Sequence, residues 1–247
     1  MHKRAYRMLV MISVVALTWL PVVDHSPSTI KASQADTISA VSATTMLGVN
    51  LITNGDAEAG IGSTDGSVIT IPGWGNVGNV ATVVQYGSAG GFPTLSSPGP
   101  SERGVNFFAG GPDSTGQDVS YLVQTIDVSS LQSSIDTGSL RYIVQGWFGG
   151  YDTQTDWSGI RIFFLNATGT LPEIGSAQAG PVTANERNNV TGLVLRSTTG
   201  TIPPQTRFIL INLDFNRFSG AGTYNDGYAD NVSLVLGSRS FLPVVIR

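Results

Sequence analysis

Two stretches decide the predicted fold: NLITNGDAEAG, residues 50–60, and DGYADNVSLVL, residues 226–236. In the first, a short apolar run leads into a turn on Asn54 and Gly55. In the second, apolar residues recur at every second position from 232 to 236, the period of a half-buried strand. Both stretches carry carboxylates beside the strand: Asp56 and Glu58 in the first, Asp226 and Asp230 in the second. Each therefore joins a predicted strand to acidic residues in a turn.

The chain between these stretches is typical of an all-β domain. Short strand candidates are separated by Gly, Pro, Ser, Asp and Asn, and no sustained helical period is present. One short helical turn is expected at residues 129–135. With 30 glycines and 12 prolines, this pattern predicts one β-sandwich domain of two antiparallel sheets over residues 49–237. The predicted strands span 49–53, 68–71, 80–86, 104–108, 120–128, 140–148, 159–165, 189–195, 207–213 and 229–236.

The paired end motifs resemble those of the galactose-binding-like jelly-roll superfamily, which includes carbohydrate-binding modules of the family 4, 9 and 22 type and related secreted cell-wall domains. In that superfamily the opening N-G-x-x-E turn and the closing aspartate strand lie side by side and hold a structural calcium. The resemblance spans roughly residues 49–236, with its specific motifs at the two ends. It implies a jelly-roll sandwich that binds glycan.

The resemblance also implies calcium ligands. Glu58 and Asp230 match the positions whose side chains bind calcium, Asp56 and Asn50 are further candidates, and Glu102 is a mid-chain candidate. Calcium takes 6 to 8 oxygen ligands in flexible geometry, and turns that mix carboxylates with free carbonyls supply them. The alternative interpretation is an ordinary turn at 54–56, with Asp230 capping backbone amides beside it.

The ends of the chain indicate export. A basic stretch followed by an apolar run from 8 to 23 has the pattern of a signal peptide over residues 1–35, cleaved after Ala35. An uncleaved N-terminal anchor is the alternative. Residues 36–48 are interpreted as a linker or flexible mature N-terminus, and 238–247 as an apolar C-terminal tail too short to span a membrane. These features predict a secreted or cell-surface protein.

Removal of residues 1–35 narrows the available chemistry, because both histidines and both lysines lie there and the chain has no cysteine. The remaining nine arginines face sixteen acidic residues, a formal net charge of −7. An acidic surface argues against nucleic acid and anionic membranes as partners. Histidine- and cysteine-based nucleophile systems, a Schiff-base lysine, and zinc sites built on imidazole or thiolate are excluded in the mature chain.

Aromatic residues mixed with amides and carboxylates suggest where a sugar would bind, because a pyranose stacks on Trp or Tyr while polar groups bind its hydroxyls. The loop after residue 148 offers Tyr151, Asp152, Gln154 and Trp157. A second loop, residues 216–227, offers Arg217 and Tyr224, although an ordinary solvated hairpin explains it equally well. The alternation before Trp147 favours a core position for that residue, and Trp74 is also assigned to the core.

The sequence therefore predicts a secreted, non-catalytic glycan-binding protein with a structural calcium. The alternative is a structural or adhesive cell-surface protein that binds another protein. A carboxylate-based glycoside hydrolase is a third hypothesis, because glycosidic cleavage needs two positioned acids. The acid pairs that could serve are Asp152 with Asp156 and Asp214 with Asp226. Neither pair carries a recognisable glycosidase signature.

Overall fold

The computed structural model describes residues 46–78, 80–113, 118–218 and 223–238. The predicted signal peptide, residues 36–45 of the predicted linker, and the tail from residue 239 onward lie outside these ranges. Within the described ranges, no helix is both long enough and apolar enough to cross a membrane.

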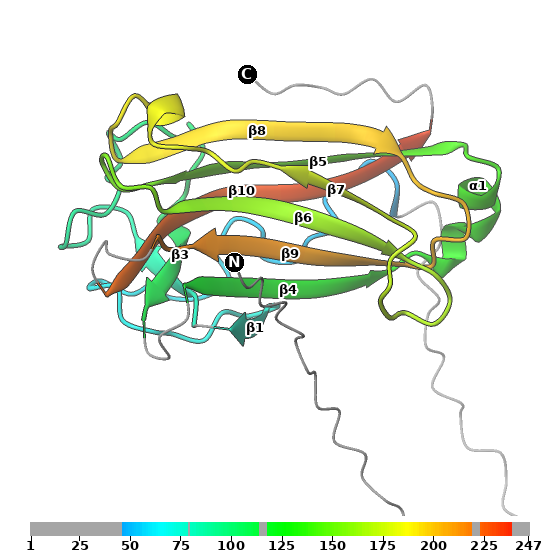
Figure 1. Cartoon of the computed structure of the whole chain (residues 1–247), viewed down its shortest axis with the longest axis horizontal. Helices are drawn as coiled ribbons and strands as arrows, with labels where there is room; N and C mark the ends of the chain where they lie inside the picture. Colours follow the sequence, from blue (N-terminus) through cyan, green and yellow to red (C-terminus); the bar gives the residue numbers. More distant parts are fainter. Residues whose placement is uncertain (1–45, 79, 114–117, 219–222, 239–247) are drawn as a thin grey trace, which may run out of the picture. The chain divides into compact units, whose positions relative to one another are not determined.

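In the described part of the chain, ten strands form two five-stranded sheets, and neighbouring strands there are antiparallel (Figure 1). The first sheet has the order β2-β3-β10-β5-β8 and the second β1-β4-β9-β6-β7. The expected jelly-roll β-sandwich is thus confirmed. The strands are β1 Gly75–Gly78, β2 Thr82–Gln85, β3 Asn106–Pro112, β4 Val119–Asp127, β5 Leu140–Gly150, β6 Trp157–Leu165, β7 Gly175–Ala179, β8 Gly192–Thr201, β9 Phe208–Asn216 and β10 Tyr224–Ser238.

The main core lies between the sheets, because alternate residues of each long strand point inward. On β6 the inward set is Ile160, Ile162 and Phe164, and on β10 it includes Leu234 and Leu236. Trp74 also packs against this core, where its ring meets Phe108 edge-on at a centroid distance of 5.7 Å. The odd-numbered residues of β6, from Trp157 onward, are therefore left on the outer face.

A second apolar cluster lies on the outer face of the first sheet. Its buried members come from β2, β3, β8, β10 and the segment 87–105: Val84, Phe92, Phe107, Ala109, Leu193 and Tyr228. Phe92 meets Phe107 and Tyr228 at 6.1 and 6.0 Å between ring centroids. The Leu193 amide donates to the Pro98 carbonyl at 2.9 Å. The segment 87–105 thus covers part of this face and leaves the rest open.

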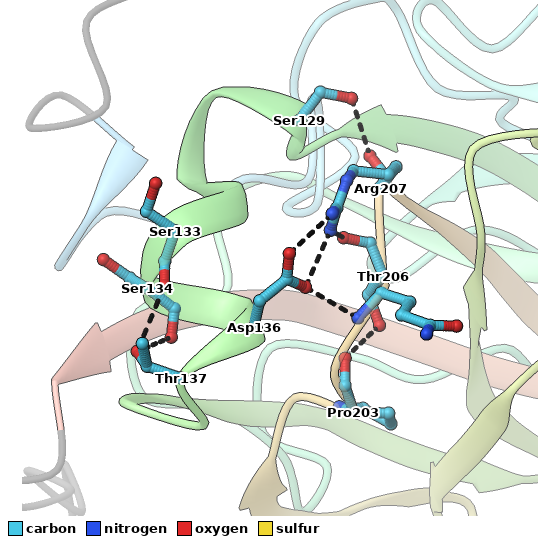
Figure 2. A network of polar contacts seen from close by, with 9 residues as sticks. Ser129, Ser133, Ser134, Asp136, Thr137, Pro203, Thr206 and Arg207 are labelled. Carbon is cyan, nitrogen blue, oxygen red and sulfur yellow. Dashed lines mark hydrogen bonds and ion pairs between the residues drawn. The ribbon is translucent and has the colours of Figure 1, made fainter.

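One end of the sandwich is closed by a short helical turn, as the sequence predicts. It comprises a 3₁₀ turn, Ser129–Leu131, and helix α1, Gln132–Asp136, which bury Leu131 and Ile135. Figure 2 shows Asp136 reaching Arg207, with Oδ2 accepting from Nη2 at 2.7 Å. The backbone amide of Gln205 donates to the same carboxylate at 2.8 Å. These bonds join the turn to the segment that enters β9.

The two motif-bearing ends of the domain lie side by side. Leu47 and Asn50 form isolated bridges with Leu236 and Val235 of β10, and the Val232 amide donates to the Gly55 carbonyl at 2.8 Å. The turn also needs Gly55, because a Cβ there would lie 2.2 Å from the Val232 carbonyl oxygen. Residues 49–53 pair through a single bridge and do not form the predicted strand.

Other strand predictions need correction. Residues 68–71 are irregular, and the strand predicted at 189–195 begins later, at Gly192. The edge strands β1 and β7 were not predicted, because GNVG and GSAQA carry too few apolar side chains to show a period of two. Trp147 also differs from its expected core position. It lies on the outer face of β5, partly buried against the second cluster.

Candidate functional site

The outer face of the second sheet is built around β6. Trp157, Gly159 and Arg161 occupy alternate positions on this strand and so share the outer face. Gly159 pairs with Asp214 of β9, which pairs with Tyr121 of β4. A hollow of about 310 Å³ lies on this face, beside the point where the backbone of residues 179–181 packs against Gly159. Its lining includes Tyr121, Trp157, Arg161, Gln178, Asp214 and Asn216, which we call the second-sheet face.

An ion pair anchors the second-sheet face. Arg161 donates from Nη2 to Asp214 Oδ1 at 3.1 Å and from Nε to Oδ2, a two-point pairing. Asp214 is buried and 3% of its side chain is exposed, whereas 40% of the Arg161 side chain is exposed. Burial raises the pKa of Asp214, while the Arg161 guanidinium opposes that rise. This ion pair fixes the Arg161 guanidinium at the surface and nearly neutralises its charge. The central carbon of the guanidinium lies 6.0 Å from the centroid of the Tyr121 ring.

Polar groups around this plane remain available. Among the described residues, the Trp157 indole N–H and the side-chain amides of Gln178 and Asn216 make no hydrogen bond to the protein. Trp157 and Asn216 are half-buried and lie directly opposite each other on β6 and β9. A partly exposed aromatic surface beside unbonded amides and a fixed guanidinium suits a sugar ring with its hydroxyls.

The predicted loop residues do not gather with Trp157. Tyr151 packs against the second cluster and against Gly91, on the outer side of the first sheet. Asp152 is exposed, and its backbone amide donates to Thr191 Oγ1 at 3.1 Å. Gln154 is half-buried, and its Oε1 is enclosed without a hydrogen-bond partner. Trp157 is thus the one residue of this predicted set that lines the second-sheet face.

A buried arginine, Arg187, organises that loop. Its Nη1 donates to the carbonyls of Asp152 and Val190 at 2.6 and 2.9 Å, and its Nη2 to that of Gln154 at 2.8 Å. Its exposed fraction is 2%, and burial lowers its pKa. Sequence reasoning missed this residue, which lies more than thirty positions from the loop that it holds.

The second predicted loop is also held by protein contacts. Arg217 Nη2 donates to Asp113 and Asp118 at 2.7 and 3.0 Å. The Tyr224 hydroxyl donates to the Gly66 carbonyl at 3.1 Å, and its ring meets Phe92 edge-on at 5.4 Å. Burial raises the pKa of Tyr224. Tyr224 therefore has an anchoring role, and sugar contacts by these two residues remain predictions.

The acids considered for hydrolysis have protein partners. Asp156 is buried and accepts from the backbone amides of Phe218 and Asp226, both at 2.9 Å. Asp214 is paired with Arg161 on the outer face of the second sheet. Asp226 lies near the start of β10, in the first sheet, and accepts from the Tyr228 hydroxyl at 2.6 Å. Asp214 and Asp226 therefore belong to different sheets.

The predicted calcium ligands lie near one another, and most of their oxygens already bind protein groups. Glu58 Oε1 accepts from the amides of Val105 and Asn106 at 2.8 and 2.7 Å. Asp230 accepts from the Tyr86 hydroxyl and the Asn231 amide, each at 2.7 Å. Burial raises the pKa of Asp230 to about 8, despite these bonds, and the charges of Glu58 and Asp56 add to that rise.

The remaining candidates have local roles. Asp56 Oδ1 accepts from the Glu58 amide at 3.3 Å, and Asn50 bonds the backbone of β10. The oxygen-rich donor set suits calcium, but within the described residues no group of three or more acidic or histidine side chains is arranged to hold a metal. Calcium stays a prediction, and the sugar contacts proposed for the second-sheet face do not involve an ion.

The signal for the second-sheet face was present in the sequence. The alternation Trp157, Gly159, Arg161 runs along one strand, with Tyr121 on another. The clustering of aromatic residues in the loops points to Trp157 but not to its partners on β4, β7 and β9. Strand order, which brings those partners together, cannot be deduced from spacing along the chain.

Comparisons with known proteins give a limited result. No known protein family matches the chain, and no curated protein matches it either. Solved structures do show similarity. The enzymatically active domain of bacteriophage CBA120 tailspike protein 4 aligns at 18% identity with a TM-score of 0.43, over 76% of this chain and 21% of that one. This chain thus spans about a fifth of the length of that tailspike domain.

Carbohydrate-binding modules, the class named by the sequence resemblance, are also among the similar structures. Family 16 Carbohydrate Binding Module-2 aligns at 17% identity and a TM-score of 0.43, over 75% of this chain and 99% of that one. The CBM22-1–GH10 modules of Clostridium thermocellum xylanase 10B align at 13% identity and a TM-score of 0.39, over 81% and 30% of the two chains. These likenesses are distant and assign no role to this chain.

Proposed function

We propose that this protein is a secreted, non-catalytic glycan-binding module whose ligand lies on the second-sheet face. The observation that carries the proposal is the row Trp157, Gly159, Arg161 on β6, where an aromatic ring and a fixed guanidinium flank an open hollow. A pyranose would stack on Trp157, and its hydroxyls would accept from the remaining Arg161 donors and exchange hydrogen bonds with Gln178 and Asn216.

The charge of the site favours a neutral glycan. Asp214 neutralises Arg161 through two hydrogen bonds, so the guanidinium offers donors without a free positive charge. A uronic acid would therefore gain little from Arg161 and would lie close to the carboxylate of Asp214.

Isothermal titration with cellohexaose as a neutral probe, alongside a panel of neutral oligosaccharides, tests this proposal. We expect Trp157→Ala to weaken binding of any bound member of the panel at least about tenfold, because the stacking surface is lost. Leu95→Ala is the control, since it removes an exposed apolar side chain from the segment that covers the first sheet and should leave affinity unchanged. Equal affinity of Trp157→Ala and the parent protein would refute the assignment of this face.

Calcium is a separate part of the proposal. A bound ion near Glu58 and Asp230 would stabilise the folded state by mass action, since the unfolded chain has no formed site. Thermal unfolding with calcium and with a chelator tests it, and an unchanged melting temperature would remove calcium from the account without affecting the sugar site.

A further inference from the structure

The outer face of the first sheet carries a second hollow, on the opposite side of the sandwich from the second-sheet face. Its volume is about 530 Å³. Strands β5, β8 and β10, the turn at 56–58 and the segment 100–104 line it, and we call it the first-sheet hollow. It opens beside the part of this face that the segment 87–105 covers.

The floor of the first-sheet hollow is aromatic and polar. Trp147 and Gln145 alternate with the core residues Val144 and Phe148, so they point outward from β5. Trp147 lies opposite Leu195 of β8. Within the described chain, neither the Trp147 indole N–H nor the Gln145 amide makes a hydrogen bond to the protein. Both are half-buried, so unmet donors and acceptors face the hollow.

The walls of the hollow are held in place by hydrogen bonds. Asn231 has a left-handed backbone (φ 47°) at the bulge of β10, and its Nδ2 donates to the Glu102 carbonyl at 2.9 Å. Arg103 donates to the carbonyls of Pro100 and Ser97 at 2.8 and 2.9 Å, and its guanidinium lies over the Tyr86 ring at 5.2 Å. The segment 100–104 is therefore fixed against the sheet.

The charge of the first-sheet hollow differs from that of the second-sheet face. Three carboxylates line it, those of Asp56, Glu58 and Glu102, against one cation, Arg103. Arg103 donates to backbone carbonyls and stacks on Tyr86, so it offers no two-point pairing to a ligand acid. Without a bound calcium ion, these three carboxylates would repel acidic ligands, while a protonated amine would meet them and the face of an indole.

We propose that the first-sheet hollow is a second sugar-binding site, which takes a pyranose unit without an acid group and gains affinity from a free amino group. The indole of Trp147 would supply the stacking surface, and Gln145 and Asn231 would bind hydroxyls. This inference extends the proposed function, because two sites on opposite outer faces would let one protein bridge two glycan chains.

Titration with a glucosamine hexamer in mildly acidic buffer, where its amines are protonated, tests the inference. We expect the hexamer to bind, Trp147→Ala to weaken that binding about tenfold or more, and Trp157→Ala to retain an amine-dependent site. Gln145→Ala, which removes a half-buried side chain that makes no hydrogen bond within the described residues, should also weaken binding, so the test does not depend on tolerance of the Trp147 substitution. An oligomer of galacturonic acid should not compete at this site.

The outcomes separate the two proposals. Unchanged affinity for the glucosamine hexamer in both Trp147→Ala and Gln145→Ala, or equal competition by the uronic acid oligomer, would overturn the first-sheet site. If cellohexaose binding is nevertheless lost in Trp157→Ala, the proposed function stands without the second site. Cellohexaose binding that is unaffected by Trp157→Ala but lost in Trp147→Ala would overturn the second-sheet assignment and support the first-sheet hollow.

Discussion

Single side chains hold this sandwich together where regular sheet pairing ends. Asn50 is an example. Its Oδ1 accepts from the amides of Ile52 and Leu234, both at 3.0 Å, and its Nδ2 donates to the Val232 carbonyl at 3.2 Å. One side chain thus replaces several ladder hydrogen bonds between the opening segment and β10. This geometry gives Asn50 a structural role, whether or not an ion binds nearby.

Asn50→Ala should lower the free energy of unfolding by about 1–3 kcal/mol, because two backbone amides and a carbonyl lose their partners. The loss should be similar with calcium and with a chelator. Denaturant unfolding measures it, and Asn185→Ala is the control, since the Asn185 side chain is exposed and makes no hydrogen bond in the described part of the chain. A loss seen only with calcium present would instead make Asn50 a metal ligand.

The ionisation of a single side chain, Asp226, makes the stability of the folded protein depend on pH. Burial raises its pKa from 3.8 to about 6, although the hydrogen bond from Tyr228 opposes the rise, and the charge of Asp156 adds to it. The folded state thus holds this proton more tightly than the unfolded state. The resulting stabilisation is complete below the unfolded pKa and is lost as pH rises through about 6.

Asp226→Asn should remove that dependence, because the amide does not ionise and still accepts from the Tyr228 hydroxyl. Relative to the parent protein, the variant should gain up to about 3 kcal/mol between pH about 4 and about 7. Denaturant unfolding at several pH values measures the difference. A difference that does not change with pH would contradict the raised pKa.

At the scale of elements, the long strands could be predicted and their partners could not. The cores of β5, β6 and β9 follow from their period of two, and the helical turn expected at 129–135 lies where the 3₁₀ turn and α1 are found. The short edge strands β1 and β7 have no such period. Trp147 shows a different limit. The strand that contains Trp147 was predicted, but the face on which its side chain lies was not, because the second apolar cluster surrounds this side chain outside the main core.

Arg187 holds the loop between β5 and β6 in place, and substitution of Arg187 tests how much this anchoring contributes to stability. Arg187→Lys should cost roughly 2–4 kcal/mol, because a single ammonium cannot replace a planar fork bonded to four separate carbonyls in a buried site. Thermal or denaturant unfolding gives the value. Arg196→Lys is the matched control and should change stability little, since the Arg196–Glu186 pair is partly exposed. Equal stability of the two variants would contradict an anchoring role for Arg187.

At the scale of the whole molecule, the two sheets present two chemically different outer faces. The second-sheet face has a charge-balanced Arg161–Asp214 pair, and the first-sheet hollow is acidic with an aromatic floor. The fold class was predictable because it depends on strand period and turn residues. The composition of the two outer faces was not predictable, because it depends on which strands become neighbours in each sheet. The β6–β9–β4 order places Trp157, Asp214 and Tyr121 on one surface from three distant segments.

The central claim is that glycan binds to the second-sheet face. Amide chemical shifts of the isotope-labelled protein, followed during titration with cellohexaose or with the tightest neutral ligand of the panel, locate binding directly. We predict that the largest changes fall on β4, β6 and β9, around Tyr121, Gly159 and Asn216, and that they disappear in Trp157→Ala. Changes confined to the first sheet or to the loop at 151–156, with β6 and β9 unaffected, would contradict the account.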